Sequence, residues 1–175
     1  MINNYLLKID KLNIKFFSDQ EIVDAVSDVS ISLMAGEILG IVGESGAGKS
    51  TIGNAIINLL DGSAKILKGK VLFDGQNLVG LDKRAMHIFR GRKIGMIFQD
   101  PQTSLNPIMT IGNQLIETIR FTKNFDKKTA QNKAIELLES VGIDNPKLRM
   151  KAYPHQFSGG MRQRVVIALA LAGDP

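Results

Sequence analysis

The chain has 175 residues, of which 44% are hydrophobic and 22% charged, a composition typical of one globular domain with enough apolar side chains for a core. Because the sequence contains no cysteine, disulfides, thiolate metal sites and cysteine nucleophiles are excluded. The net charge of +5 comes from basic residues spread along the chain without an aromatic-interleaved cluster, which argues against a nucleic-acid-binding protein. The longest apolar run, Val165 to Ala172, is too short to cross a bilayer, and the N-terminus lacks a signal-peptide pattern.

Two N-terminal segments alternate apolar and polar residues, which predicts half-buried antiparallel strands. They cover residues 6–17 and 22–33, and the turn Ser18-Asp19-Gln20 separates them. Phe16 and Phe17 end the first segment. Either ring can stack on a nucleotide base or pack into the core, and the sequence leaves both interpretations open.

The segment ILGIVGESGAGKST, residues 38–51, combines a short apolar run with a glycine-rich loop. Residues 38–42 predict a strand buried on both faces. The loop matches G-x-x-x-x-G-K-[ST], in which backbone amides and a helix N-terminus surround phosphates, the lysine reaches the β- and γ-phosphates, and the hydroxyl binds Mg²⁺. The predicted nucleotide-binding residues are Gly43, Glu44, Ser45, Gly46, Ala47, Gly48, Lys49, Ser50 and Thr51.

The region after the loop predicts a helix over residues 49–60, stopped by Asp61-Gly62-Ser63, and a short strand over residues 70–73. Asp74 follows that strand, where an Mg²⁺-binding aspartate could lie. Because Gly75 follows directly, Asp74 is interpreted as a turn residue.

A further helix is predicted over residues 81–90 and an apolar strand over residues 93–98. Gln99 follows this strand, and ligands of parallel α/β sheets lie beyond the carboxyl ends of the strands. Gln99 is therefore a candidate for contact with the bound nucleotide. The next residues, 100–107, are rich in turn formers and predict a loop.

Two amphipathic helices are predicted after this loop, and they indicate a small helical subdomain inserted into the α/β body. Gly142 is the expected C-terminal stop of the second helix. The apolar stripes consist of Ile111, Leu115, Ile116 and Ile119 in the first helix and Ala130, Ala134, Leu137, Leu138 and Val141 in the second.

A second glycine motif, Phe157-Ser158-Gly159-Gly160-Met161, opens the last predicted helix. Ser158 is a favourable N-cap residue, and the two glycines leave the first-turn amides uncovered, as in an anion site. A single nucleotide does not need two such sites from one chain. A head-to-tail pair, in which each chain covers the γ-phosphate held by the other, would use both; the alternative is a capped helix without further function.

The order GESGAGKST, IFQDP, FSGGMRQR resembles the nucleotide-binding subunit of ATP-binding cassette (ABC) transporters. GIVGESGAGKS, MIFQDPQTSLNP and YPHQFSGGMRQRV resemble most the group that imports oligopeptides, dipeptides and nickel. The resemblance covers the whole chain. It implies a P-loop NTPase fold of class α/β, with N-terminal antiparallel strands, an inserted helical subdomain and a missing C-terminal part.

The resemblance also implies roles for individual residues, with ATP and Mg²⁺ as cofactors. Phe16 would stack on adenine, residues 43–51 would be the Walker A loop, and Gln99 would contact Mg²⁺ and the attacking water. Lys49 and Gln99 are thus the candidate catalytic residues, and Ser50 and Gln99 the candidate metal ligands. The signature residues that would complete a partner's site are Ser158, Gly159, Gly160 and Gln163.

The implied partners are a second ATPase subunit, transmembrane permease subunits that dock on residues 100–150, and indirectly a solute-binding protein. This places the chain at the cytoplasmic face of the membrane. The expected division is residues 1–99 for the β-subdomain and P-loop core, 100–156 for the helical subdomain, and 157–175 for the signature helix.

The chain departs from the family at its end, because the family continues into a strand that closes with Asp-Glu and later supplies a histidine. His87 and His155 both precede the signature and do not match that histidine. The sequence is therefore interpreted as an N-terminal portion of an importer ATPase. Two alternatives stay open: a nucleotide-binding fragment without catalytic activity, and a soluble ABC-type ATPase of DNA repair, although such ATPases carry long coiled-coil or zinc insertions between the glutamine and the signature. A phosphate-loop kinase is disfavoured, because it would not need Ser-Gly-Gly at a helix start or Gln99 in this position.

Overall fold

The computed structural model describes residues 5–19 and 21–175, apart from the side chains of residues 101 and 102. These residues form two compact units, one ending at Met86 and the other spanning His87–Pro175, and each unit is described separately. The three-part division expected from the sequence remains a prediction.

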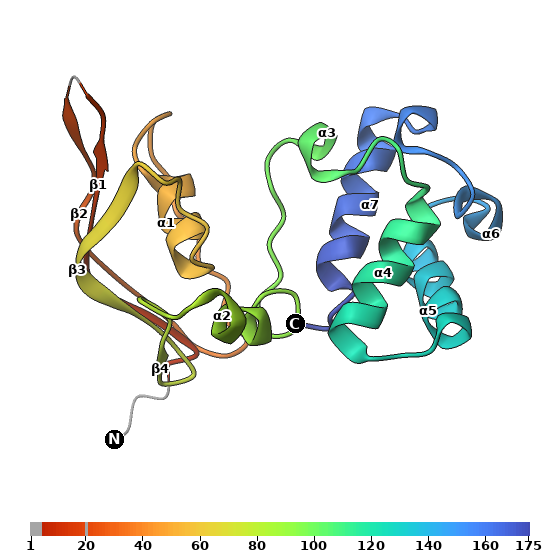
Figure 1. Ribbon diagram of the computed structural model, residues 1–175, viewed down its shortest axis with the longest axis horizontal. Helices are drawn as coiled ribbons and strands as arrows, with labels where there is room; N and C mark the ends of the chain where they lie inside the picture. The colour runs from red at the N-terminus through yellow and green to blue at the C-terminus, as the bar shows by residue number, and fades with distance from the viewer. Residues whose placement is uncertain (1–4, 20) are drawn as a thin grey trace. The chain divides into compact units, whose positions relative to one another are not determined.

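The first unit is built on a four-stranded antiparallel sheet with strand order β2-β1-β3-β4 (Figure 1). The predicted N-terminal hairpin is confirmed, although Gln20 of its turn lies outside the described residues. Phe17 pairs with Ile22 at one end of the hairpin and Leu7 with Leu33 at the other. The strands are β1 (Leu7–Phe17), β2 (Ile22–Leu33), β3 (Ala64–Phe73) and β4 (Gln76–Asn77).

Strand β3 is longer than predicted, because β1 offers pairing partners as far as Phe16, which lies opposite Ala64. Gly69 lies beside an irregularity of β1, and its φ is 99°. A Cβ atom there would lie 2.6 Å from the Lys11 carbonyl oxygen, so glycine is required for the strands to approach. Asp74 (φ 47°) and Gly75 (φ 79°) form the turn between β3 and β4, as predicted.

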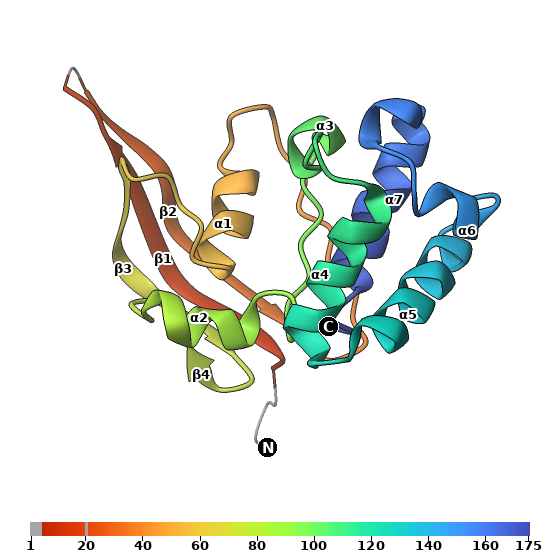
Figure 2. The ribbon, with the colours of Figure 1, turned by 45° about the vertical axis from the view of Figure 1, so that its right-hand side comes forward.

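One helix, α1 (Lys49–Ile56), packs against this sheet and buries Ile52 and Ala55 (Figures 1 and 2). The prediction of a helix as far as residue 60 was wrong. Asn58 adopts a left-handed backbone conformation (φ 51°), and its side-chain amide donates to the Leu81 carbonyl at 3.1 Å. The chain therefore leaves the helix before the predicted stop.

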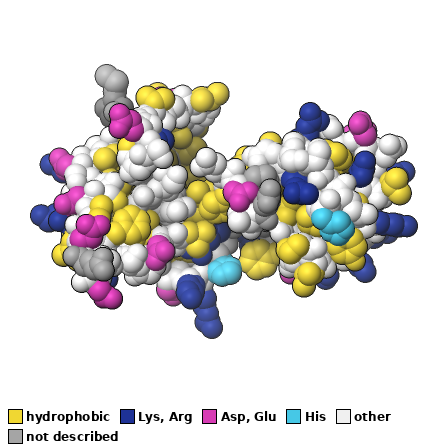
Figure 3. Space-filling view, turned by 90° about the horizontal axis from the view of Figure 1, so that it is seen from above, with side chains coloured by type: hydrophobic (Ala, Val, Ile, Leu, Met, Phe, Trp, Pro, Cys, Tyr) yellow, Lys and Arg dark blue, Asp and Glu magenta, His cyan; other side chains and the backbone are white. Residues whose placement is uncertain are grey.

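The predicted strands at residues 38–42 and 93–98 are also absent from the structure. Ile38 and Val42 are 97% and 93% exposed, and Ile97 and Phe98 are exposed as well. A buried strand needs a hydrogen-bonded neighbour on each side, and within the described ranges the only bridge to either segment is the local one between Arg90 and Ile94. Hydrophobic side chains are visible at the surface of both units in Figure 3.

The second unit is helical, and both predicted amphipathic helices are confirmed. Helices α4 (Ile111–Lys123) and α5 (Lys127–Ser140) lie side by side and pack with α7 (Gly159–Leu171) (Figures 1 and 2). Their apolar stripes form one core that includes Ile111, Leu115, Ile119, Ala134, Leu138, Phe157 and Val165. The shorter elements are α3 (Pro101–Ser104), α6 (Pro146–Arg149) and the 3₁₀ turn η1 (Pro154–Gln156); α2 (Lys83–Phe89) straddles the boundary between the units.

Helix boundaries in this unit follow from capping side chains and left-handed residues. Thr110, Asp126 and Ser158 cap the N-termini of α4, α5 and α7 by accepting a bond from a first-turn backbone amide. Gly142 ends α5 with φ 73°, as predicted. Within the part of the chain that the structure describes, every helix is too short or too polar to span a membrane.

Candidate nucleotide site

The phosphate loop is an exposed turn between residues 38–43, which form neither helix nor strand, and α1. The Lys49 ammonium folds back over the loop and donates to the carbonyl oxygens of Gly43 at 2.8 Å and Glu44 at 2.6 Å. The Ala47 amide donates to the same Glu44 carbonyl at 3.2 Å. The Lys49 side chain and the backbone thus close a loop that can surround a bound anion.

Gly48 is the residue at which the loop enters α1, and both its conformation and its surroundings require glycine. Its φ is 82°, in the left-handed region, and a Cβ atom would lie 2.3 Å from the Ala25 carbonyl oxygen. Gly48 supplies no side chain to cap α1, so no capping side chain covers the first-turn amides. Such a helix start favours a phosphate group through its amides and its dipole.

Ser50 and Thr51 occupy the first turn of α1, where Ser50 is exposed. A serine hydroxyl is a hard oxygen ligand, and Mg²⁺ in nucleotide sites is commonly held by one or two protein groups together with substrate phosphates. In residues 5–19 and 21–175 no cluster of three or more His, Cys, Asp or Glu side chains could hold a metal ion by itself. The Ser50 hydroxyl is thus a donor that fits an Mg²⁺ ion bound together with a nucleotide.

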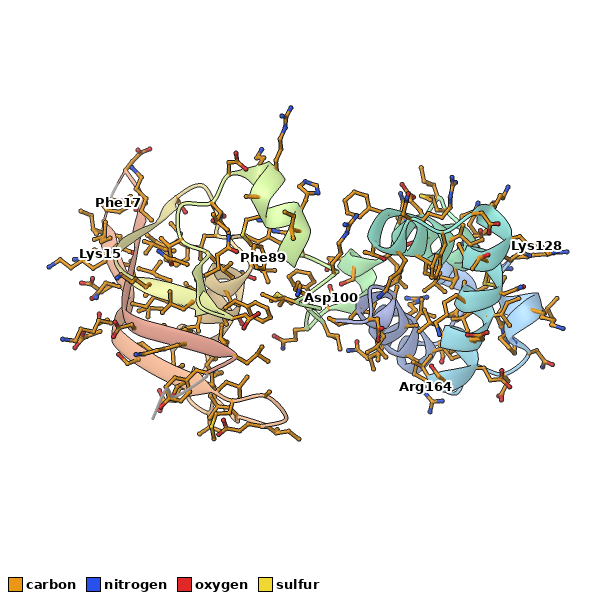
Figure 4. All side chains as sticks on the ribbon, turned by 90° about the horizontal axis from the view of Figure 1, so that it is seen from below. Lys15, Phe17, Phe89, Asp100, Lys128 and Arg164 are labelled. Atoms are coloured by element: carbon orange, nitrogen blue, oxygen red, sulfur yellow. The ribbon has the colours of Figure 1, made fainter. Side chains whose placement is uncertain are left out.

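The two phenylalanines at the end of β1 are both half-buried. Phe17 is labelled in Figure 4, and the Lys65 ammonium lies 5.5 Å from the centre of its ring. Phe16 pairs with Val23 of β2 and Ala64 of β3. Because successive residues of a strand face opposite sides of the sheet, only one of the two rings can face a given ligand; the adenine-stacking role of Phe16 remains a prediction.

Gln99 lies in the second unit, is exposed, and precedes α3. The Asp100 carbonyl accepts bonds from the hydroxyls of Thr103 at 3.1 Å and Ser104 at 2.9 Å. These bonds hold the start of α3 at Pro101, and Asp100 separates Gln99 from the helix. The contact of Gln99 with Mg²⁺ and water remains a prediction.

The signature residues open α7, also in the second unit. The Ser158 hydroxyl accepts a bond from the Met161 amide at 3.3 Å, which confirms the predicted N-cap. Gly159, Gly160 and Ser158 are exposed, and a Cβ atom on either glycine would meet no atom within 4 Å. Alanine favours a helix by about 1 kcal/mol over glycine, so neither local packing nor helix propensity explains glycine here.

Residues 43–51 thus lie together, in one loop and the first turn of α1. Gln99 and the signature residues, including the half-buried Gln163, lie in the other unit. Sequence reasoning included Arg162 only within the signature range 158–163 and gave Arg164 no role. The Arg162 Nε donates to the Pro154 carbonyl at 2.8 Å, and Arg164, labelled in Figure 4, donates from Nη1 to the Gly142 carbonyl at 2.7 Å. Their targets are backbone atoms, for which sequence carries no signal.

Comparison with known proteins shows that the loop and the signature both lie within the part of the chain that matches one family model. Residues 26–175 match a family model described as "ABC transporter". The chain is 45% identical over 172 residues to an oligopeptide transport ATP-binding protein, OppD, of Haemophilus influenzae, and 44% identical over 170 residues to a dipeptide transport ATP-binding protein, DppD, of Escherichia coli. These alignments cover 98% and 97% of this chain and 53% and 52% of the relatives, so the chain spans about half the length of the curated relatives it matches.

A solved structure resembles the computed one closely. It is a dimeric post-hydrolysis state of the ATP-binding cassette MJ0796 bound to ADP and Pi, with a TM-score of 0.86 and 30% sequence identity. The match covers 97% of this chain and 70% of that one. The expected fold class is therefore confirmed.

Proposed function

This chain belongs to the ABC transporter family, and from that premise we propose that it is an N-terminal portion of an importer ATPase that couples ATP binding and hydrolysis to uptake of peptides or nickel. The observation that carries the proposal is the loop at residues 43–51, where Lys49, glycine turns and an uncapped helix start converge. The names of the relatives, oligopeptide and dipeptide transport proteins, support peptides as the transported class. Nickel rests on the resemblance of the motifs alone.

The loop would bind the phosphates of ATP through residues that the chain already orients. Backbone amides at the start of α1 would donate to phosphate oxygens, and Lys49 would exchange its two carbonyl partners for the β- and γ-phosphates. Ser50 would hold Mg²⁺, whose charge offsets that of the phosphates. Gln99 would orient the attacking water, and Phe16 would stack on adenine.

A second ATPase subunit would complete the site. The structural relative is dimeric, and the open surface over Gly159 and Gly160 supports close approach by a partner's nucleotide. Ser158 and the amides of the two glycines would then donate to the γ-phosphate that the partner's loop holds, with Gln163 beside them. In a transporter the helices of the second unit would dock on permease subunits at the cytoplasmic face of the membrane, and a solute-binding protein would act on those permeases.

The test is an isothermal titration of the chain with ATP and Mg²⁺, alongside Lys49→Ala and the control Lys83→Ala, whose lysine lies exposed on α2. Loss of a charge-assisted hydrogen-bonding partner typically costs about 1.5–3 kcal/mol, so Lys49→Ala should weaken ATP binding by at least about tenfold. The control should bind like the unmodified chain. Equal binding by all three proteins would refute the assignment of the loop.

A further inference from the structure

Arg162 connects the first turn of α7 to the 3₁₀ turn that precedes it. Its Nε atom donates to the Pro154 carbonyl oxygen at 2.8 Å. The same oxygen accepts the Phe157 amide at 3.1 Å, and Pro154 is buried. The Arg162 side chain therefore holds the backbone segment that leads into α7.

The turn itself is fixed at both ends. The Tyr153 amide donates to the Gln156 side chain at 2.8 Å, and the Gln156 amide returns a bond to the Tyr153 carbonyl at 2.9 Å. Phe157 is buried in the core of the second unit, with the Arg149 guanidinium 5.5 Å from its ring centre. Ser158 follows immediately, so its position depends on how this rigid turn is held against α7.

We propose that Arg162 is a positioning residue for the phosphate contact in trans: through Pro154 it sets the orientation of the Ser158 hydroxyl and of the Gly159 and Gly160 amides toward a nucleotide bound by a second copy. This inference rests on the proposed function. Hydrogen bonds weaken steeply as their angle departs from linearity. Donors that must bind a phosphate on another chain therefore require that the preceding turn keep one orientation relative to α7.

The contact is made by Nε, so the role needs an N–H donor at this atom and not the positive charge. This distinguishes Arg162 from an arginine that binds phosphate directly. In glutamine the side-chain nitrogen lies the same number of bonds from Cα as Nε of arginine. In methionine a methyl group occupies that place. Arg162→Gln keeps the donor without the charge, and Arg162→Met keeps an aliphatic side chain of similar reach without the donor.

The experiment measures self-association of the full chain by sedimentation, with and without Mg²⁺ and a non-hydrolysable ATP analogue. We expect nucleotide-dependent association of the unmodified chain and of Arg162→Gln, and association of Arg162→Met that is weaker by about five- to tenfold, the effect of one lost hydrogen bond. Calorimetry of analogue binding to monomers should give equal affinities for all three, because each phosphate loop is intact. Arg84→Met, an exposed position on α2, is the matched control.

Hydrogen exchange of residues 153–161 provides a second measurement that does not require association. Exchange should be faster in Arg162→Met and unchanged in Arg162→Gln. Equal association and equal exchange of Arg162→Met and the unmodified chain would overturn the role of Arg162, and equal weakening by both substitutions would assign its action to charge instead. An unmodified chain that binds the analogue yet stays monomeric would overturn the proposed pairing itself, a different result.

Discussion

Asp126 illustrates how a single side chain makes the stability of the helical unit depend on pH. It caps α5, and its carboxylate accepts the Thr129 amide at 2.6 Å. Bonds from the Thr129 side chain and backbone, with a smaller contribution from the charge of Arg120, lower the pKa of Asp126 below its ordinary value of 3.8. Folding therefore favours the ionised carboxylate. Its contribution to stability is complete above the unfolded-state pKa and is lost as the pH falls through the lower folded-state pKa.

This linkage predicts the behaviour of Asp126→Asn, in which the cap acceptor remains but no longer titrates. Between neutral pH and about pH 2, the melting temperature of the variant should fall less than that of the unmodified chain. Helical circular dichroism recorded during thermal melts at a series of pH values measures the difference. Parallel pH profiles for the two proteins would contradict the proposed linkage.

At the scale of single residues, sequence reasoning succeeded where a local backbone conformation or a helix cap requires a particular residue type. Gly48, Gly142 and the Ser158 cap were all predictable, because left-handed conformations and N-caps select particular residues. The partners of Lys49 and Arg162 were not predictable. Both donate to backbone carbonyls, and every residue of the chain has one.

At the scale of elements, helices were predicted better than strands, for a physical reason. The stripes of α4 and α5 bury their residues against neighbours close in sequence and against α7. A strand at residues 38–42 needs hydrogen-bonded neighbours from distant segments, and the apolar pattern of the segment says nothing of where those neighbours come from. The hairpin was predictable, since its partner strand follows after one turn.

The contrast between exposed and buried apolar residues can be tested with Ile38→Lys and Leu115→Ala. Ile38 is 97% exposed and Leu115 is fully buried. Ile38→Lys should change the free energy of unfolding by less than about 0.5 kcal/mol and reduce nucleotide-independent aggregation, because it removes an exposed apolar side chain. Leu115→Ala should cost about 2–5 kcal/mol.

Urea denaturation and light scattering measure the two quantities. A large loss of stability in Ile38→Lys would indicate that residues 38–42 are packed in solution, contrary to the structure described above. An equally soluble unmodified chain would show that these exposed side chains do not drive aggregation.

At the scale of the whole molecule, binding and turnover should separate. Under the proposed function, Lys49, Ser50 and Gln99 would contribute to phosphoryl transfer, which depends on positioning and charge stabilisation. The Asp-Glu pair that the resemblance implies does not occur in this sequence, and Asp74 lies in the turn after β3. Loss of a general base typically slows a reaction by about 10²- to 10⁴-fold. The 175-residue chain should therefore bind ATP and hydrolyse it far more slowly than about 1 s⁻¹, a modest enzymatic rate.

Steady-state phosphate release with Mg²⁺ measures this rate, and Lys49→Ala gives the background. Turnover near about 1 s⁻¹ that disappears in Lys49→Ala would show that an acid within the chain acts as the base. Asp74→Asn and Asp100→Asn would then identify which carboxylate is responsible.

The two glycines of the signature have a genetic consequence. A Cβ atom on Gly159 or Gly160 would meet nothing within 4 Å, so packing inside the chain places no steric constraint on these positions, and under the proposed pairing their constraint comes from assembly. An alanine there would leave the fold intact or slightly more stable, because alanine favours a helix by about 1 kcal/mol over glycine, and in the proposed pair it would damage the site of the neighbouring subunit. In a cell that makes normal and altered copies in equal amounts, most pairs formed at random would contain at least one altered copy, so such a change would be inherited as a dominant defect.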